Sequence, residues 1–314
     1  MPNTQPHSPL LLRASAQLRQ RILARIGGAA LAAVASASVF AVLFIFLFIV
    51  RDALPFFARE GFREFFTGAH WHPSGNPPRF GAAPILFGTF YVTFLSSLIA
   101  VPFGICAAVA ISDMLGAKLR DIVKTLVEIL AAIPSVAYGF FALVVVAPWM
   151  QSLGAARGAN ALNVSLVLAL MALPTIVSLA EDALRAVPRD LREASCALGA
   201  TRAETLFRVV IPSARGGICA ACLLGVMRAL GETMVVWMAS GNSAKFPSPW
   251  YNVFDSVRTL TATIVGEMGE ADHATASSRY SALFAMALCL LVFSLLMNTL
   301  SGWLVRRAGR ITKR

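Results

Sequence analysis

The chain has 314 residues, of which 57% are apolar and 14% charged, and its formal net charge is +11. This apolar share excludes a soluble domain and indicates a membrane protein. The basic residues flank apolar runs instead of forming one surface, which favours the positive-inside pattern of membrane proteins over a nucleic-acid partner.

Apolar runs predict an all-α, polytopic protein with six membrane-spanning helices, because about 20 apolar residues are enough for a helix to cross a bilayer. We place the spans at 27–50, 85–112, 125–150, 163–180, 217–241 and 281–305. The first run is longer than the apolar core of a cleaved signal peptide, about 7 to 15 residues. We therefore expect it to be an uncleaved anchor.

Basic residues predict which loops lie in the cytosol. The segments 1–26, 113–124, 181–216 and 306–314 together hold 18 Lys and Arg, against 8 in 51–84, 151–162 and 242–280. This bias predicts a multi-pass protein of the cytoplasmic membrane with both termini in the cytosol. We divide the chain into a basic tail (1–26), a first span with its extracytoplasmic loop (27–84), a transmembrane core (85–305) and a second basic tail (306–314).

The third span contains Pro134 and, four residues later, Tyr138. A proline this deep in a span kinks the helix and frees a backbone carbonyl, which must find a partner in neighbouring helices or in a water-lined cavity. The kink serves either packing alone or a pathway through the bundle.

The polar loop 181–216 predicts two short helices in an L. Pro188 suits the first turn of the first helix, and Gly199 suits the left-handed residue that ends it. Thr201 and Glu204 form a capping box, so a second helix should begin at once. Leu191, Ala194 and Leu198 would share one face of the first helix.

This loop resembles the EAA motif of binding-protein-dependent ABC importer permeases. Glu193, Ala194, Gly199 and Pro212 match it, while Ser195, Val209 and Ile211 are replacements of similar size. The resemblance implies that Glu193, Ala194, Gly199, Ile211 and Pro212 couple the chain to a partner ATPase. The alternative is a generic helix-turn-helix loop between spans.

The fifth span carries two charges, Arg228 and Glu232. Each costs about 2.5 to 3.5 kcal/mol on insertion scales unless it faces a cavity or a partner. One helical turn separates them, so they can form a structural ion pair. Alternatively, the Arg228 guanidinium lines a substrate pathway and binds an oxyanion, with Glu232 holding the guanidinium and weakening the binding.

Three stretches, at 133–139, 227–242 and 258–270, resemble the PstC permease subunits of phosphate importers. This resemblance implies a type I ABC importer (MetI-like) fold and phosphate as the substrate. It also implies three partners: a PstA-like second permease, two copies of a PstB-like ATPase and a PstS-like extracytoplasmic phosphate-binding protein. Membrane lipid surrounds such a chain. Part of 242–280 is expected to re-enter the membrane.

No enzyme motif accompanies these features. The sequence has no G-x-x-x-x-G-K-[ST] phosphate loop, H-E-x-x-H helix or G-x-S-x-G elbow, so we expect a transporter subunit without catalytic residues, cofactor or metal. Cys219 and Cys222, and His70 and His72, lack the further ligands of a metal site. Two alternatives to phosphate import remain: the same architecture for another oxyanion or an organic solute, and a membrane scaffold or channel without an ATPase.

Overall fold

A computed structural model describes residues 14–269 and 278–311 of the chain. Parts of the segments named above lie outside these ranges: residues 1–13 of the first basic tail, Glu270 at the end of the 258–270 stretch, and residues 312–314 of the second tail. Two compact units are distinguished, Met1–Arg51 and Asp52–Arg314.

The described chain is almost entirely helical. Its helices are α1 (Ala14–Glu60), α2 (Phe62–Thr67), α3 (Ala83–Val109), α4 (Ala117–Ala132), α5 (Ser135–Phe141), α6 (Ala147–Ser152), α7 (Ala161–Arg185), α8 (Arg189–Ala197), α9 (Arg202–Thr205), α10 (Ile211–Leu230), α11 (Met234–Ala239), α12 (Leu260–Met268) and α13 (Ser278–Ile311). Three π-helical turns, at Ala110–Met114, Ala142–Val146 and Leu206–Val210, continue α3, join α5 to α6 and join α9 to α10. A two-stranded antiparallel hairpin pairs β1 (Trp71–His72) with β2 (Arg79–Phe80).

Six helical segments are long and apolar enough to cross a membrane, which confirms the predicted number within the described residues. They are Leu23–Glu60, Ala83–Met114, Ser135–Ser152, Ala161–Arg185, Arg202–Leu230 and Ser278–Trp303. The helical content likewise confirms the all-α class. In the first unit α1 is already helical at Ala14, so the predicted tail 1–26 is helical over its described part.

The third span is broken, not kinked. α4 ends at Ala132, the chain is extended at Ile133 and Pro134, and α5 begins at Ser135. Because Pro134 has no N–H, the carbonyl of Leu130 loses its helical partner. That carbonyl accepts instead from the Ile133 N–H at 3.4 Å and from the Tyr138 hydroxyl at 2.8 Å, so its partners come from the same span.

The predicted bounds of the fifth span were wrong. Its helix begins at Arg202 instead of 217, because α9, the π-helical turn and α10 are continuous, and it ends at Leu230 instead of 241. A separate short helix, α11, follows after a three-residue break.

α7 is the central helix of the second unit. It packs between α3 and α10, and 61% of its most apolar window is buried, against 33% or less in the other spans. Close approach is possible because glycines face it: a Cβ added to Gly104 of α3 would lie 2.6 Å from Cγ2 of Ile176, and one added to Gly225 of α10 would collide with Cγ1 of the same residue. Small residues at such contacts let membrane helices pack backbone to backbone.

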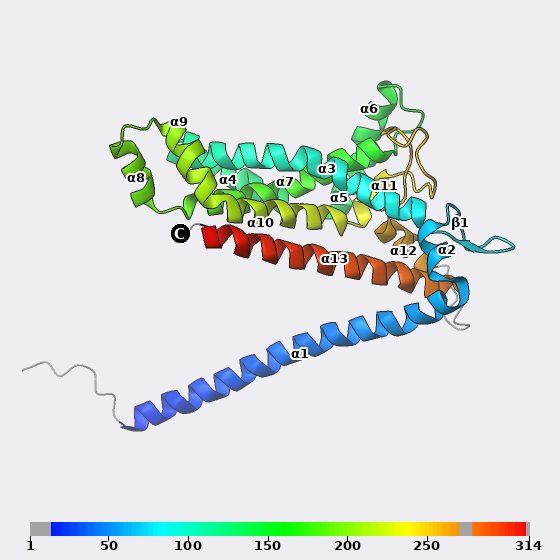
Figure 1. Ribbon diagram of the computed structural model, residues 1–314, viewed down its shortest axis with the longest axis horizontal. Coiled ribbons are helices and arrows are strands. Elements are labelled where there is room, and N and C mark those ends of the chain that lie inside the picture. The colour runs from blue at the N-terminus through cyan, green and yellow to red at the C-terminus, as the bar shows by residue number, and fades with distance from the viewer. Residues whose placement is uncertain (1–13, 270–277, 312–314) are drawn as a thin grey trace, which may run out of the picture. The chain divides into compact units, whose positions relative to one another are not determined.

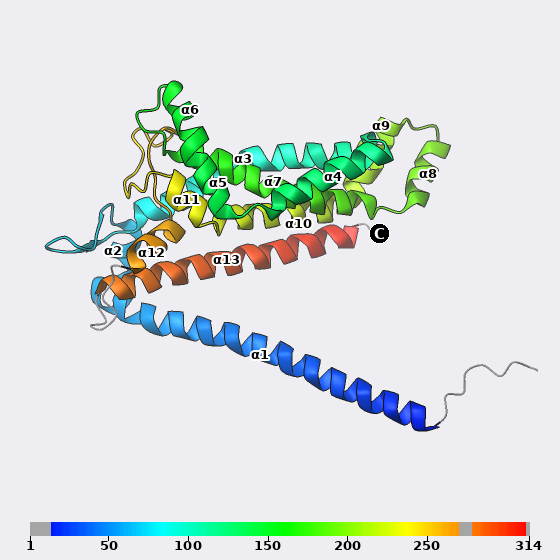
Figure 2. The same cartoon turned by 180° about the vertical axis from the view of Figure 1, so that it is seen from behind.

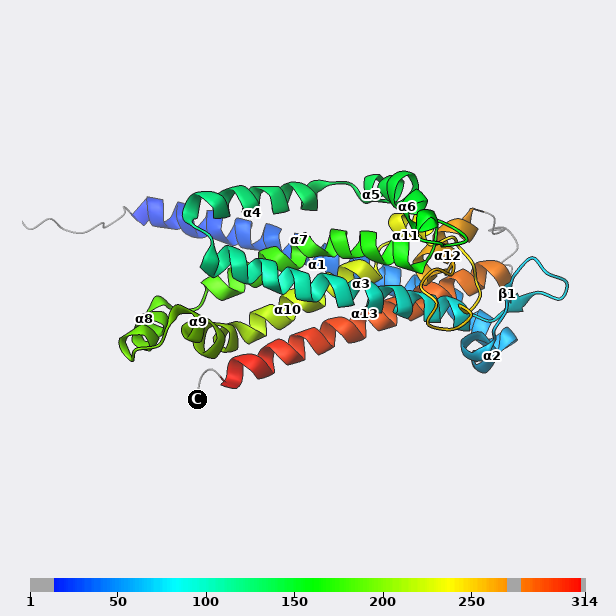
Figure 3. The ribbon, with the colours of Figure 1, turned by 90° about the horizontal axis from the view of Figure 1, so that it is seen from above.

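The second unit has two functional ends. α8 and α9 lie at one end of the bundle, whereas α6, α11, α12 and the β1–β2 hairpin lie at the opposite end (Figures 1, 2 and 3). We call these the α8 end and the α12 end.

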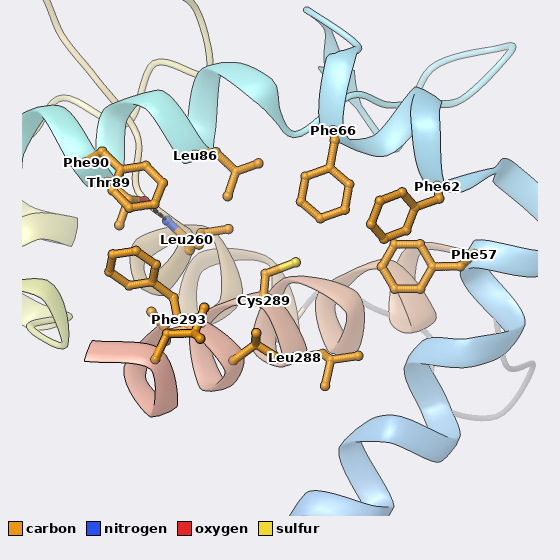
Figure 4. A pocket seen from close by; sticks show the side chains of 13 residues that line it. Phe57, Phe62, Phe66, Leu86, Thr89, Phe90, Leu260, Leu288, Cys289 and Phe293 are labelled. Atoms are coloured by element: carbon orange, nitrogen blue, oxygen red, sulfur yellow. Dashed lines mark hydrogen bonds between the residues drawn. The ribbon is translucent and has the colours of Figure 1, made fainter. Parts of the chain in front are cut away.

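An apolar cavity of about 380 Å³ lies between the last turns of α1, the short helix α2, the first turns of α3, the start of α12 and the middle of α13 (Figure 4). Phenylalanine rings and aliphatic side chains form its walls, and the one hydroxyl there, on Thr89, already accepts a hydrogen bond from the backbone N–H of Leu260 at 3.0 Å. A cavity with no free polar group cannot replace the hydration of an anion. It is therefore excluded as an oxyanion site.

We predict that Gly225→Val destabilises the protein, because its side chain would collide with the buried Ile176 and overpacking costs about 1 to 3 kcal/mol. The measurement is the thermal unfolding midpoint in detergent. Gly28→Val is the matched control, since Gly28 is also helical and has no atom within 4 Å of an added Cβ. Ile176→Ala should recover part of the loss in the Gly225→Val background, and an unchanged midpoint for Gly225→Val alone would contradict this account of the packing.

Candidate functional site

The predicted L-shaped loop is present at the α8 end. Pro188 is the N-cap of α8, one position before the first turn that the sequence predicted. Gly199 has φ +85°, which confirms the left-handed residue after the helix. The capping box is confirmed as well, since the Thr201 side chain accepts from the Glu204 N–H and the Glu204 side chain accepts from the Thr201 N–H.

The second arm of the L differs from the prediction. α9 has only four residues and continues through the π-helical turn into α10, so the second short helix is the start of the fifth span. Ile211 and Pro212 occupy the first turn of α10, directly after the turn. Pro212 has no N–H to donate to a carbonyl in the preceding turn. Because it follows the wider π-helical turn, it occupies a position where no α-helical hydrogen bond is needed.

α8 is held firmly against the bundle. The Arg192 guanidinium pairs with Asp113 of the π-helical turn after α3 and donates to the Leu184 carbonyl of α7 at 2.9 Å. The hydroxyls of Ser195 and Thr205 are 2.9 Å apart and join α8 to α9. The sequence analysis did not predict this role for Arg192, although its position next to Glu193 of the motif could have indicated it. α8 is therefore connected to three of the candidate spans.

The outer face of α8 carries the predicted coupling residues. Glu193 and Ala194 are exposed, and so are two large apolar side chains, Leu191 at 42% and Leu198 at 90% exposure. The structure brings Glu193, Ala194 and Gly199 together on this projecting element, and Ile211 and Pro212 at the base of its second arm.

A buried carboxylate ties α4 to α7 near the same end. Glu181 is 1% exposed, and it accepts from Lys124 of α4 at 2.9 Å and from Arg185 at 3.3 Å. The hydrogen bond with Glu181 raises the pKa of Lys124 above its usual value. A raised lysine pKa means that this stabilisation is complete at neutral pH and is lost only when the pH rises through that pKa.

Arg228 and Glu232 do not lie on one helix, so the two residues are not one helical turn apart, and the alternative of an intrahelical ion pair is not seen in the described residues. α10 ends at Leu230, and Glu232 lies in the break before α11, where its Oε1 accepts from the Met234 N–H at 3.2 Å. In the described part of the chain neither a hydrogen bond nor an ion pair joins Arg228 to Glu232. Arg228 is exposed and lies within electrostatic range of Tyr138 on α5.

The two broken spans meet at the α12 end. α5 follows the break at Pro134, α11 follows the break at Glu232, and the two short helices pack so closely that a Cβ on Gly139 would lie 2.7 Å from the Met238 sulfur. Interrupted helices that pack together present helix ends and free polar groups at membrane depth, which is how many transporters build substrate sites.

A second buried carboxylate, Glu267 of α12, was missed by the sequence analysis as a structural centre. It is 5% exposed and accepts from the Trp71 indole of the hairpin at 2.8 Å and from Arg258 at 2.9 Å, and Arg279 of α13 lies 3.6 Å away. In the sequence, the spacing of Arg258 and Glu267 around an apolar helix could have indicated this cluster.

α12 also touches the break in the fifth span. The Thr261 hydroxyl donates to the Glu232 carbonyl at 2.9 Å. The Glu267 cluster therefore fixes the hairpin, α12 and α13 around the segment that carries Arg228 and Glu232.

The remaining candidates form no metal site. His70 and His72 are exposed, and all five cysteines are free. Within residues 14–269 and 278–311 no group of three His, Cys, Asp or Glu side chains is positioned to hold a metal ion.

Comparison with known proteins adds the family. The family model described as "Binding-protein-dependent transport system inner membrane component" matches residues 100–310. The chain belongs to this family. Its match spans the L-shaped loop, both broken spans and α12. Together with the six candidate spans, membership makes the chain a multi-pass inner membrane protein.

Relatives of this family member carry transport names. The Bacillus subtilis protein "Probable ABC transporter permease protein YqgH" is 38% identical over 245 residues, 78% of each chain. "Phosphate transport system permease protein PstC" of Mesorhizobium japonicum is 33% identical over 78% of each chain. The PstC of Pasteurella multocida is 31% identical over 85% of this chain and 89% of the relative. The predicted PstC-like resemblance is confirmed, and these relatives are named permeases, not enzymes.

Solved structures confirm the predicted fold. A bacterial alginate ABC transporter matches with a TM-score of 0.61 at 16% identity, covering 96% of this chain and 99% of the transporter chain. The MetNI methionine ABC transporter matches with a TM-score of 0.55 at 21% identity, covering 70% of this chain and 93% of the other. The permease therefore has the predicted MetI-like importer fold.

We predict that Glu267→Gln lowers the amount of folded permease recovered from membranes, because removing one partner of a buried ion pair costs about 3 to 5 kcal/mol. Glu64→Gln is the matched control, since Glu64 is an exposed glutamate of the neighbouring helix α2. Monodisperse protein is measured by size-exclusion chromatography and unfolding by a thermal scan. Equal behaviour of the two variants would show that the Glu267 cluster does not stabilise this end.

Proposed function

We propose that the chain is the membrane-spanning permease subunit of an ATP-driven, binding-protein-dependent importer that translocates inorganic phosphate across the cytoplasmic membrane. Phosphate is proposed as the substrate because relatives that are 31 to 33% identical over most of both chains are named phosphate transport permeases. The broken spans with an exposed arginine support it physically, because an oxyanion needs a guanidinium or similar donor inside the membrane.

We infer that a PstB-like ATPase covers the α8 end on the cytosolic side. The excess of Lys and Arg in the loops at this end supports the orientation. The exposed Leu198, together with Glu193 and Ala194, supports the contact, because α8 presents a rigid knob whose anchor, Arg192, reaches two spans. Glu193, Ala194, Gly199, Ile211 and Pro212 are the proposed coupling residues.

We infer that a PstA-like second permease completes the pathway and that lipid covers the remaining apolar surface. α4 has no buried residue, and four of its large apolar side chains are exposed: Leu119, Ile122, Leu126 and Ile129. Arg228 is exposed on this single subunit. A charged side chain at membrane depth needs a cavity or a partner, which a second subunit provides. A PstS-like binding protein delivers phosphate to the α12 end.

Arg228 and Glu232 are the proposed substrate-pathway residues, with different tasks. The Arg228 guanidinium offers two parallel N–H donors that match a phosphate edge. Glu232 caps the start of α11 through the Met234 N–H and thereby fixes the break in the helix beside the pathway. Its charge also keeps an anion from binding too tightly, since transport requires release.

We predict that Arg228→Gln lowers phosphate uptake at least tenfold per assembled complex, because a hydrogen bond to a charged group contributes about 1.5 to 3 kcal/mol. Arg228→Lys should retain part of the activity, since the charge remains without the bidentate geometry. The measurement is labelled phosphate uptake by vesicles that contain the complete complex, normalised to the permease recovered with its ATPase.

Arg63→Gln, a change at an exposed arginine of α2, is the control and should transport normally. Normal uptake by Arg228→Gln would remove this residue from the pathway. A wild-type complex that takes up molybdate and not phosphate would contradict the substrate, and purification without any ATPase would favour a scaffold or channel.

We predict that Gly199→Val uncouples the ATPase, so that binding-protein-stimulated hydrolysis falls towards the basal rate in reconstituted complex. An added Cβ meets no atom within 4 Å, so the effect arises from the positive φ alone, which a β-branched residue adopts poorly. Gly199→Asn should be milder, because asparagine tolerates this conformation. Gly116→Val is the control, since Gly116 has equal space and a negative φ of −64°. Wild-type stimulation in Gly199→Val would argue against a coupling role for this turn.

A further inference from the structure

A polar pocket of about 260 Å³ lies at the α12 end, outside the residues discussed so far. It is formed between the loop that follows α6 and the loop that joins α11 to α12. The residues that matter for its chemistry are Arg157, Ser243, Lys245, Ser248, Asp255 and Ser256.

Backbone contacts hold the two loops in place. The N–H groups of Ala161 and Leu162 donate to the carbonyls of Asp255 and Val253 at 3.0 and 2.8 Å, and the Ser256 hydroxyl donates to the Ala159 carbonyl at 2.9 Å. The walls of the pocket are therefore preorganised, which lowers the cost of binding a small ligand.

The charges in the pocket favour an anion. The Asp255 carboxylate is already engaged, since Oδ2 accepts from the Ser248 N–H at 2.7 Å and Oδ1 from the Asn252 amide at 3.0 Å. Arg157 and Lys245 have no side-chain hydrogen bond or ion pair in the described part of the chain. The pocket thus offers a guanidinium, an ammonium and the hydroxyls of Ser243 and Ser248, whereas the Ser256 hydroxyl is already engaged with the Ala159 carbonyl, and the net charge of the pocket is positive.

These donors are the ones that a tetrahedral oxyanion takes. Arginine binds two oxygens of such an anion in parallel, lysine contributes a point charge, and hydroxyls complete the shell. The single carboxylate keeps the attraction moderate.

The pocket is close to the proposed pathway along the chain. Ser243 follows α11, and Glu232 lies at the start of this helix. α11 has six residues, so it spans about 9 Å at 1.5 Å per residue. α11 therefore connects the loop that lines the pocket to the break that carries Glu232.

We infer that this pocket is a receiving site for the transported oxyanion, which occupies it after release from the binding protein and before it reaches Arg228. The inference rests on the proposed function and on the α12 end facing outwards. An acidic patch of the binding protein would also be attracted to Arg157 and Lys245, but a concave pocket between two pinned loops suits a small anion better than a protein surface.

The test is labelled phosphate uptake by reconstituted complex while the concentration of loaded binding protein is varied, for wild type, Arg157→Gln, Lys245→Gln and the double variant. If the pocket receives the anion, the maximal uptake per complex falls about tenfold in the double variant and the half-saturating concentration of binding protein is unchanged. Arg79→Gln, at an exposed arginine of β2 on the same end, should match wild type.

Two results would overturn the inference. A higher half-saturating concentration with full maximal uptake would show that the two cations contact the binding protein, and wild-type values for both quantities would show no role. A second measurement does not depend on transport: broadening of the ³¹P resonance of inorganic phosphate by the complex without binding protein, expected for wild type and lost in the double variant. Absence of uptake by the wild-type complex would instead contradict the proposed function, while the ³¹P measurement would still test the pocket.

Discussion

The main constraint on this structure is that backbone N–H and C=O groups inside the membrane cannot form hydrogen bonds with water. Wherever a spanning helix is broken or widened, a carbonyl or an N–H must find a donor or acceptor within the protein. Three side chains meet this need: Tyr138 donates to the Leu130 carbonyl freed by Pro134, buried Asn163 donates to the Ala142 carbonyl in a π-helical turn at 3.1 Å, and Glu232 accepts from the Met234 N–H. Because these bonds exist, the chain can interrupt two spans without leaving these backbone groups unpaired.

A buried carboxylate with two cationic partners lies towards each end of the bundle. Glu181 and Glu267 are both buried carboxylates, and each is surrounded by two cationic side chains from different elements. Such clusters fix the neighbouring helices, since any partner left alone would be an uncompensated buried charge. Arg228, Arg157 and Lys245 have no such compensation in the described residues. The chain thus has charges that connect its helices and charges that have no side-chain partner within the described residues.

Local signals in the sequence predicted the fold well. The apolar runs gave six spans, and the Thr201–Glu204 box and Gly199 gave the turn of the L-shaped loop, because capping and left-handed glycines depend on neighbouring residues alone. The end of the fifth helix was not predictable in this way. Met234 to Gly241 is as apolar as a span, and the break at Gly231 to Thr233 depends on contacts with α5 and α12, far away in the sequence.

The site could be predicted only in part, for the same reason. Motif resemblance pointed to Glu193, Gly199 and Arg228 as individual residues. It did not reveal that Trp71 and Glu267 meet across 196 positions of sequence, or that Arg157 and Lys245 line one pocket. Tertiary contacts of this kind leave no periodic pattern along the chain.

The π-helical turn at Leu206–Val210 joins α9 to α10, so the helix is continuous from Arg202 to Leu230. Its 29 residues span roughly 40 Å at about 1.5 Å per residue, from the capping box of the L-shaped loop to the turn that holds Arg228. A tilt of about 5° with its pivot near Arg202 would displace the far end by roughly 4 Å, more than the length of a hydrogen bond. A small rotation of α8 would thus be enlarged along this continuous helix and would shift the position of Arg228.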